Sequence, residues 1–174
     1  FTLGTGVIAI ADPDEWDDKG DPDALCRYWS WLDTPPIPLL NVDPNQLTVS
    51  FDSSWRPEDS QKAQAVAQFP GVDDVELLYW ESDSVSPWYH EDSENETVAV
   101  DLAPLDGVPA SAKYMRLSFA MLDATNDWWW AIDNLSVRSS DANPVDHLVS
   151  ISGQPILSED DTTPQDVQVA LLSQ

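Results

Sequence analysis

The sequence has little positive charge, one cysteine and no long hydrophobic run. Only 7 of its 174 residues are lysine or arginine, against 32 aspartates and glutamates, and the net charge is −25. This balance argues against binding to nucleic acid or anionic membranes, because both attract basic patches. The single cysteine, Cys26, excludes an internal disulfide. No run of 18 apolar residues is present, so we expect no membrane insertion.

Catalytic motifs are also scarce. The two histidines, His90 and His147, belong to no zinc-binding or triad pattern, and no G-x-S-x-G, P-loop or G-x-G-x-x-G motif occurs. The many acidic residues leave open a carboxylate pair of the glycosidase type. We nevertheless predict that the protein is not an enzyme, because no base with a positioning partner is found.

The sequence is rich in aromatic and aliphatic residues. Nine tryptophans and 42% apolar residues can build a core, which distinguishes the chain from disordered acidic sequences. Short β-branched and aromatic runs recur between Pro, Gly, Asn and Asp, a pattern typical of strands and turns. The predicted strands span residues 3–11, 27–32, 46–52, 63–69, 75–80, 97–102, 113–122 and 128–137. With 14 prolines, this spacing predicts an all-β fold, an antiparallel β-sandwich.

The character of the chain changes near residue 138. We expect residues 1–138 to form the sandwich domain and residues 139–174 to form a linker and a C-terminal extension. The linker reads "SSDANPVD", and "HLVSISGQPIL" and "DVQVALL" read as two further strands. These strands could join the sandwich, begin another domain, or pair with a neighbouring molecule through an exposed edge.

The stretch "DPDEWDDKGDPD" from Asp12 to Asp23 holds seven carboxylates in twelve residues. Such a density repels itself unless it is solvated or neutralised by a cation, and hard oxygen ligands in excess favour Ca²⁺. It is not an EF-hand loop, because Trp16 and Asp17 stand where a ligand and the glycine belong. A calcium site and a solvated acidic loop are therefore the two interpretations.

Asp133 lies within "WAIDNLSV", which reads as a buried strand. Alternation places it with Ala131 and Leu135 on the inward side, and an unpaired buried carboxylate costs several kcal/mol. Three arrangements would remove this cost: a bound Ca²⁺, an ion pair with Arg56 or Arg116, or a β-bulge that turns Asp133 outward.

These motifs resemble a known group of domains. "WAIDNLSV" resembles the last strand of jelly-roll sandwiches, namely MAM domains and the related carbohydrate-binding modules of secreted bacterial proteins. Together with "ADPDEWDD" and "LTVSFDSSWRPED" it is similar to an acidic group found in marine bacterial multidomain proteins. The resemblance covers residues 1–138 and implies a jelly roll whose calcium is bound by Asp133 with Asp12 or Asp14. The cysteine pairs of animal MAM domains are missing.

Tryptophans in two loops have the chemistry of a sugar-binding surface, because exposed aromatic rings stack on pyranose faces beside carboxylates and amides. The loops are "SSWRPEDSQ" and "YWESDSVSPWYHEDSEN", and alternation turns Trp129 away from its two neighbours. Core packing is the alternative for each tryptophan, and Arg56 could instead clamp the acidic loop. The candidate carbohydrate-binding residues are Trp55, Arg56, Trp80, Trp88, Tyr89 and Trp129.

The sequence therefore predicts a non-catalytic, calcium-stabilised module that is secreted, as part of a larger extracellular or cell-surface protein. It would bind polysaccharide or anchor a neighbouring domain. The alternative is a structural subunit of a calcium-dependent extracellular fibre, adhesin or matrix, assembled through the C-terminal strands.

Overall fold

A computed structural model describes residues 1–13, 27–39, 42–58, 60–125 and 127–139. Over these ranges the chain forms strands, one short 3₁₀-helix (η2, Pro44–Gln46) and no α-helix. Among these described residues, no helix is long and apolar enough to span a membrane. The strands are β1 (Ala9–Ala11), β2 (Tyr28–Asp33), β3 (Ile37–Pro38), β4 (Leu47–Trp55), β5 (Lys62–Gln68), β6 (Val75–Glu81), β7 (Ser93–Asp101), β8 (Tyr114–Ala124) and β9 (Trp130–Ser139).

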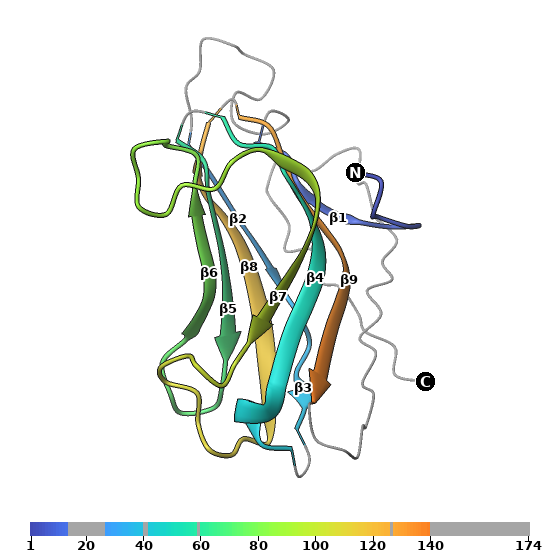
Figure 1. Ribbon diagram of the computed structural model, residues 1–174, viewed down its shortest axis with the longest axis vertical. Helices are drawn as coiled ribbons and strands as arrows, with labels where there is room; N and C mark the ends of the chain where they lie inside the picture. The colour runs from blue at the N-terminus through green and yellow to red at the C-terminus, as the bar shows by residue number, and fades with distance from the viewer. Residues whose placement is uncertain (14–26, 40–41, 59, 126, 140–174) are drawn as a thin grey trace, which may run out of the picture.

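The strands form two antiparallel sheets that pack against each other (Figure 1). One sheet has the order β1-β9-β4-β7, and the other has the order β2-β8-β5-β6 with the short β3 also paired to β8. The chain crosses repeatedly from one sheet to the other between its long strands, as in a double-sheet jelly roll. The prediction of an antiparallel β-sandwich is confirmed. Apart from Ser139, which ends β9, the predicted C-terminal extension lies outside the described residues.

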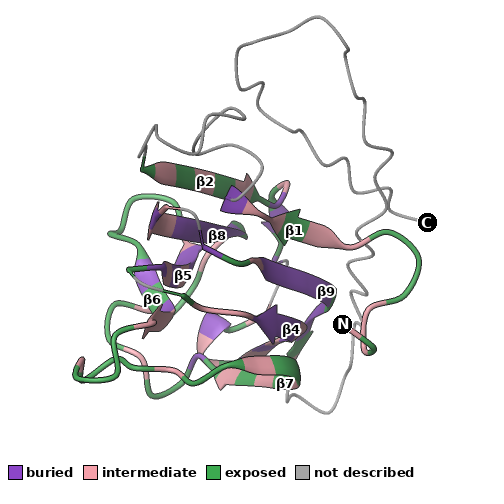
Figure 2. Ribbon diagram, turned by 90° about the horizontal axis from the view of Figure 1, so that it is seen from above, coloured by how far each residue is buried: buried purple, intermediate pink, exposed green. Residues whose placement is uncertain are grey.

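The core lies between the two sheets, where the inward residues of alternating strands meet. Along β4 and β8 alternate apolar residues are buried in this core, among them Val49 and Phe51 on β4 and Leu117 and Phe119 on β8. Aromatic rings interlock at the centre: Phe51 meets Phe119 edge-on at 5.1 Å, and Trp130 lies 6.1 Å from Phe119. Figure 2 shows the buried strands in the middle of each sheet and the more exposed β2 and β7 at the edges.

A β-bulge in β9 decides the direction of Asp133. Asn134 and Leu135 together occupy the space opposite Phe51 of β4, and Asn134 has a positive φ of 52°. The extra residue changes the phase of the strand, so Ile132 and Leu135 both reach the core. Asp133 then faces away from the core, and its expected place among the inward residues is wrong. Of the three arrangements considered for Asp133, the structure shows the bulge.

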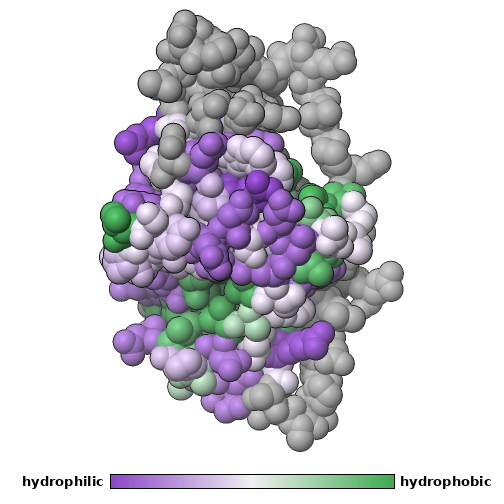
Figure 3. Space-filling view, turned by 45° about the horizontal axis from the view of Figure 1, so that its top comes forward, coloured by the Kyte–Doolittle hydropathy of each residue, from purple (hydrophilic) through white to green (hydrophobic). Residues whose placement is uncertain are grey.

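The surface reflects the acidic composition. On the face shown in Figure 3, hydrophilic residues surround a band of hydrophobic surface. Most of the acidic residues that the structure describes therefore lie around the apolar core, and only Asp127 and Asp133 among them are buried.

Candidate functional site

Asp133 is buried even though it faces outward, with 7% of its surface exposed. Residues 1–8, here called the N-terminal strap, cover it. The backbone N–H of Thr5 donates to Asp133 Oδ2 at 2.7 Å, and the Asn134 side chain donates to the Leu3 carbonyl at 3.1 Å. The hydrogen bond from Thr5 therefore compensates part of the cost of burying this carboxylate.

The strap reaches the opposite edge of the sheet and is packed on itself. The Thr2 hydroxyl donates to Asn95 Oδ1 of β7 at 2.9 Å. A Cβ atom at Gly4 would lie 2.8 Å from Ile8 Cγ2 and 2.9 Å from Phe1 Cδ1. A larger residue here would have to displace the side chain of Ile8 or Phe1, so glycine fits this close packing.

The structure does not bring Asp12 and Asp133 together. Ala11 pairs with Trp130, so Asp12 lies about four residues, roughly 13 Å, along β9 from Asp133. Two oxygens that share a Ca²⁺ lie within about 5 Å of each other. The third predicted ligand, Asp14, lies outside the described residues. In the described part of the chain, no three His, Cys, Asp or Glu residues are grouped as a metal site.

The carboxylate opposite Asp133 is Asp52, its register partner on β4. Asp52 Oδ1 accepts from the Thr97 hydroxyl at 2.6 Å, and Oδ2 accepts from the Asn134 amide at 2.8 Å. Neither carboxylate has an ion pair with a described lysine or arginine. Two like charges directly opposite on adjacent strands are unfavourable, and the nearby Leu3 carbonyl makes the donor set all oxygen. That set fits the chemistry of Ca²⁺.

Two of the predicted sugar-binding tryptophans belong to the interior. Trp55 is fully buried, and its Nε1 donates to the His90 carbonyl at 3.2 Å. Trp80 lies 5.9 Å from Trp55 and stacks on the His90 ring at 3.9 Å. Trp55 cannot stack on a sugar, because no face of its ring reaches solvent, and the prediction for it is wrong. Trp80 is half-buried, with one ring face covered by His90.

Arg56 is occupied by partners of its own. Its guanidinium lies 4.4 Å from the centre of the Trp128 ring and forms ion pairs with Asp92 and Glu94. The Nε atom approaches Asp92 to 3.0 Å, but not at a hydrogen-bonding angle. Arg56 therefore ties Trp128 to the start of β7. Most of the acidic loop it was expected to clamp lies outside the described residues.

The three consecutive tryptophans differ in burial, because β9 begins only at Trp130. Trp130 is in the core and its Nε1 donates to Ser53 at 3.1 Å. Trp129 is half-buried and donates to Ser54 at 3.2 Å, while Trp128 is 45% exposed. The expected alternation of the run is wrong, since two of its members precede the strand.

Trp88 and Tyr89 are the predicted sugar-binding residues that the structure exposes, at 54% and 46%. They lie in the loop 82–90, which is held against β6. The Glu81 N–H donates to the Trp88 carbonyl at 2.9 Å, and the His90 N–H donates to the Glu81 carbonyl at 3.0 Å. The Trp88 ring meets Tyr79 edge-on at 5.8 Å. The loop therefore presents Trp88 beside the outer face of the five-stranded sheet.

That outer face carries a line of side chains that crosses all four long strands. Trp31 of β2 pairs with Ala120 of β8, Ala120 with Gln64 of β5, and Gln64 with Tyr79 of β6. We call Trp31, Ala120, Gln64, Tyr79 and Trp88 the aromatic row. Its outer strands are three strand spacings, roughly 14 Å, apart. Trp31 is 64% exposed, whereas Ala120 is buried. The rings at the two ends of the row therefore project further from the sheet than the small Ala120 between them.

Trp29 and Trp31 were not among the residues predicted to bind sugar. In "YWSWLD" both tryptophans fall on the same side of a strand, and both are exposed in the structure. The alternation along this strand can be read directly from the sequence. It showed that the two rings share a face, but it did not show that this face is the solvent side.

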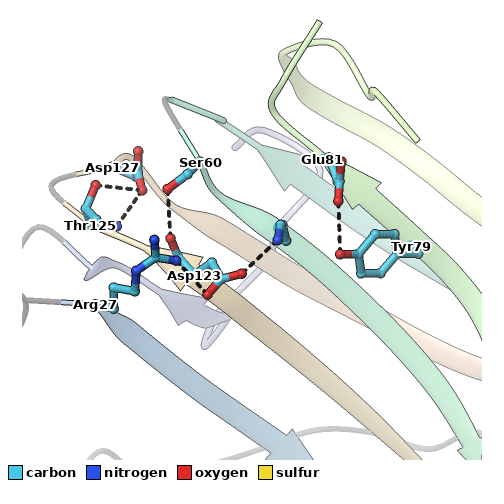
Figure 4. A network of polar contacts seen from close by, with 8 residues as sticks. Arg27, Ser60, Tyr79, Glu81, Asp123, Thr125 and Asp127 are labelled. Atoms are coloured by element: carbon cyan, nitrogen blue, oxygen red, sulfur yellow. Dashed lines mark hydrogen bonds and ion pairs between the residues drawn. The ribbon is translucent and has the colours of Figure 1, made fainter. Parts of the chain in front are cut away.

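A polar network runs alongside the row, in the neighbouring line of residues across the strands (Figure 4). Asp123 accepts from Lys62 at 2.7 Å and from Arg27 at 2.9 Å. The hydrogen bond from Lys62, with that from Arg27, holds the pKa of the Asp123 carboxyl below its usual value. The same bond raises the pKa of Lys62. Burial, with the hydrogen bond to Glu81, raises the pKa of Tyr79, which keeps its hydroxyl protonated.

No protein-family model matches the sequence, and no curated protein matches it significantly. The class that fold and site define is a jelly-roll-like β-sandwich with aromatic rings exposed on one sheet.

Proposed function

We propose that the protein is a non-catalytic polysaccharide-binding module whose ligand lies on the aromatic row. The observation that carries this proposal is the exposure of Trp31 in register with Gln64 and Tyr79. Aromatic faces stack on the apolar faces of sugar rings, and adjacent amide and carboxylate groups bind the hydroxyls. The row supplies both kinds of contact on a rigid sheet.

The grouping of the rings supports binding more than a single exposed tryptophan would. Isolated surface hydrophobics are normal, whereas several on one face indicate an interaction site. Trp29 adds a fourth ring beside Trp31, and the loop hydrogen bonds position Trp88 without a ligand. An ordered site loses less entropy on binding.

A bound Ca²⁺ is part of this proposal as a stabilising ion. Asp52 and Asp133 would bind it, with the Leu3 carbonyl as a further oxygen ligand, and its charge would offset their mutual repulsion. The resemblance to secreted modules supports an extracellular location. The rival, a fibre subunit joined through the C-terminal strands, concerns residues outside those that the structure describes.

Affinity electrophoresis in gels containing soluble polysaccharides tests the proposed function. Trp31→Ala should weaken binding about tenfold, since a lost stacking contact removes roughly 1.4 kcal/mol. Trp128→Ala is the matched control, because Trp128 is comparably exposed but packs on Arg56 away from the row. The proposal fails if wild type is not retarded by any polysaccharide, or if the two variants behave alike.

A further inference from the structure

The charged groups next to the aromatic row are carboxylates. Glu76 Oε2 accepts from the Gln64 side chain at 3.1 Å, and Glu81 Oε1 accepts from the Tyr79 hydroxyl at 3.1 Å. Asp33 lies beside Trp31 at the other end of the face and is exposed. Each end of the row therefore has a carboxylate next to it.

Cations are not similarly placed. Lys62 lies in the neighbouring line of residues and Arg27 at the border of the face, and both are paired with Asp123. Arg116 pairs in register with Gln68, two lines away from Trp31 along β8. The row itself contains no basic residue.

From this arrangement we infer that the aromatic row takes an uncharged polysaccharide chain, laid across the strands from Trp31 to Trp88. The inference rests on the proposed function and narrows its ligand. Carboxylates are strong acceptors for sugar hydroxyls, because the bond is charge-assisted. A uronate or sulfate group would instead meet Glu76 or Glu81, because Lys62, the cation opposite Glu81, is already paired with Asp123. Like-charge contacts of this kind disfavour wrong partners.

The direction of the chain follows from the positions of the rings. A ligand that runs across the strands contacts aromatic rings at both of its ends, with Ala120 and Gln64 between them. Along β2 it would meet only Trp29 and Trp31 at the edge of the sheet, and Trp88 would make no contact.

The test compares neutral glucans and xylans with alginate and a sulfated galactan of similar length, by titration at low ionic strength. We expect the neutral chains to bind at least tenfold more tightly, and their affinity to change less than twofold in high salt. Glu76→Gln should reduce the preference over alginate at least threefold. An acidic polysaccharide that binds as tightly as the neutral ones overturns the inference, and so does an unchanged preference in Glu76→Gln.

Trp88→Ala tests the direction of the chain and should weaken neutral binding at least threefold, with folding checked by circular dichroism. If Trp31→Ala weakens binding and Trp88→Ala does not, the chain does not span the row. The absence of all polysaccharide binding would instead contradict the proposed function itself, so the two failures are distinguishable.

Discussion

At the scale of single residues, Asp133 and Asp52 place two carboxylates directly opposite each other on neighbouring strands. Both are aspartates on adjacent strands, and neither has a basic partner among the described residues. Hydrogen bonds from Thr5, Thr97 and Asn134 satisfy three of their four oxygens. They do not remove the repulsion between two negative charges.

Calcium should therefore stabilise the fold through these two residues. At a Ca²⁺ concentration 100 times the dissociation constant, the free energy of unfolding should rise by about 2.7 kcal/mol relative to EDTA. Thermal unfolding of Asp133→Asn and Asp52→Asn should show little of this gain. Asp12→Asn is the control and should retain it, because the register places Asp12 far from Asp133. The opposite pattern, or no effect of Ca²⁺ on wild type, would contradict the site.

Asp123 should contribute acid-sensitive stability. Its pKa is lowered by Lys62 and Arg27, so its contribution is complete above the unfolded pKa, about 3.9, and is lost as the pH falls through the lower folded value. Asp123→Asn should cost about 1 kcal/mol or less near neutral pH. The asparagine also suits the positive φ of 54° at this position.

Denaturant unfolding of wild type and Asp123→Asn from neutral pH to about pH 2 measures this contribution. The difference between the two should shrink toward zero at the acid end. A difference that is independent of pH would mean that the ion pair with Lys62 contributes nothing to stability.

At the scale of elements, the loop 82–90 connects the two sheets. His90 stacks on Trp80 of β6, its Nε2 lies 2.9 Å from Glu96 Oε1 of β7, and its carbonyl accepts from Trp55 of β4. β6 and β7 are end strands of different sheets and are not hydrogen-bonded to each other. His90 therefore closes this side of the sandwich and fixes the loop that presents Trp88.

His90→Ala should destabilise the protein by about 1–2 kcal/mol, because it removes a stacked ring and a hydrogen bond. Polysaccharide affinity should fall with it, since Trp88 loses its support. His90→Phe is the control: it keeps the stack on Trp80 and should recover most of the stability. Chemical denaturation and affinity titration of both variants measure these effects. Equal losses in the two variants would show that the stack contributes nothing.

At the scale of the whole molecule, a net charge of −25 acts against the compact state. The described ion pairs have only Arg27, Arg56 and Lys62 as their cations, so most of the described acidic residues repel one another through solvent. The core between the sheets must offset this repulsion.

The melting temperature should therefore rise by several degrees between about 0.02 and 1 M NaCl, because the Debye length falls from tens of ångströms to about 3 Å. The same titration near pH 4 is the control, since roughly half of the carboxylates are then neutral and the rise should be smaller. A melting temperature that falls with salt at neutral pH would show that attractive pairs dominate.

Alternation along the strands was sufficient to predict the sandwich and most of its core. Phe51 and Phe119 fell on apolar faces of period two, and burying such a face requires a second sheet. β7 was predicted to begin at residue 97, but begins at Ser93. Its first residues are polar on both faces, and they form a strand only because β4 lies alongside to pair with them.

The sequence by itself determined the fold class, because hydrophobic period and turn residues are local properties of the chain. The tertiary structure decided where the functional groups lie. One bulged residue reversed the direction of Asp133, and pairing across four strands brought Trp31 into line with Tyr79. Strand register and the solvent side of a sheet depend on contacts between segments far apart in sequence, so no local pattern contains them.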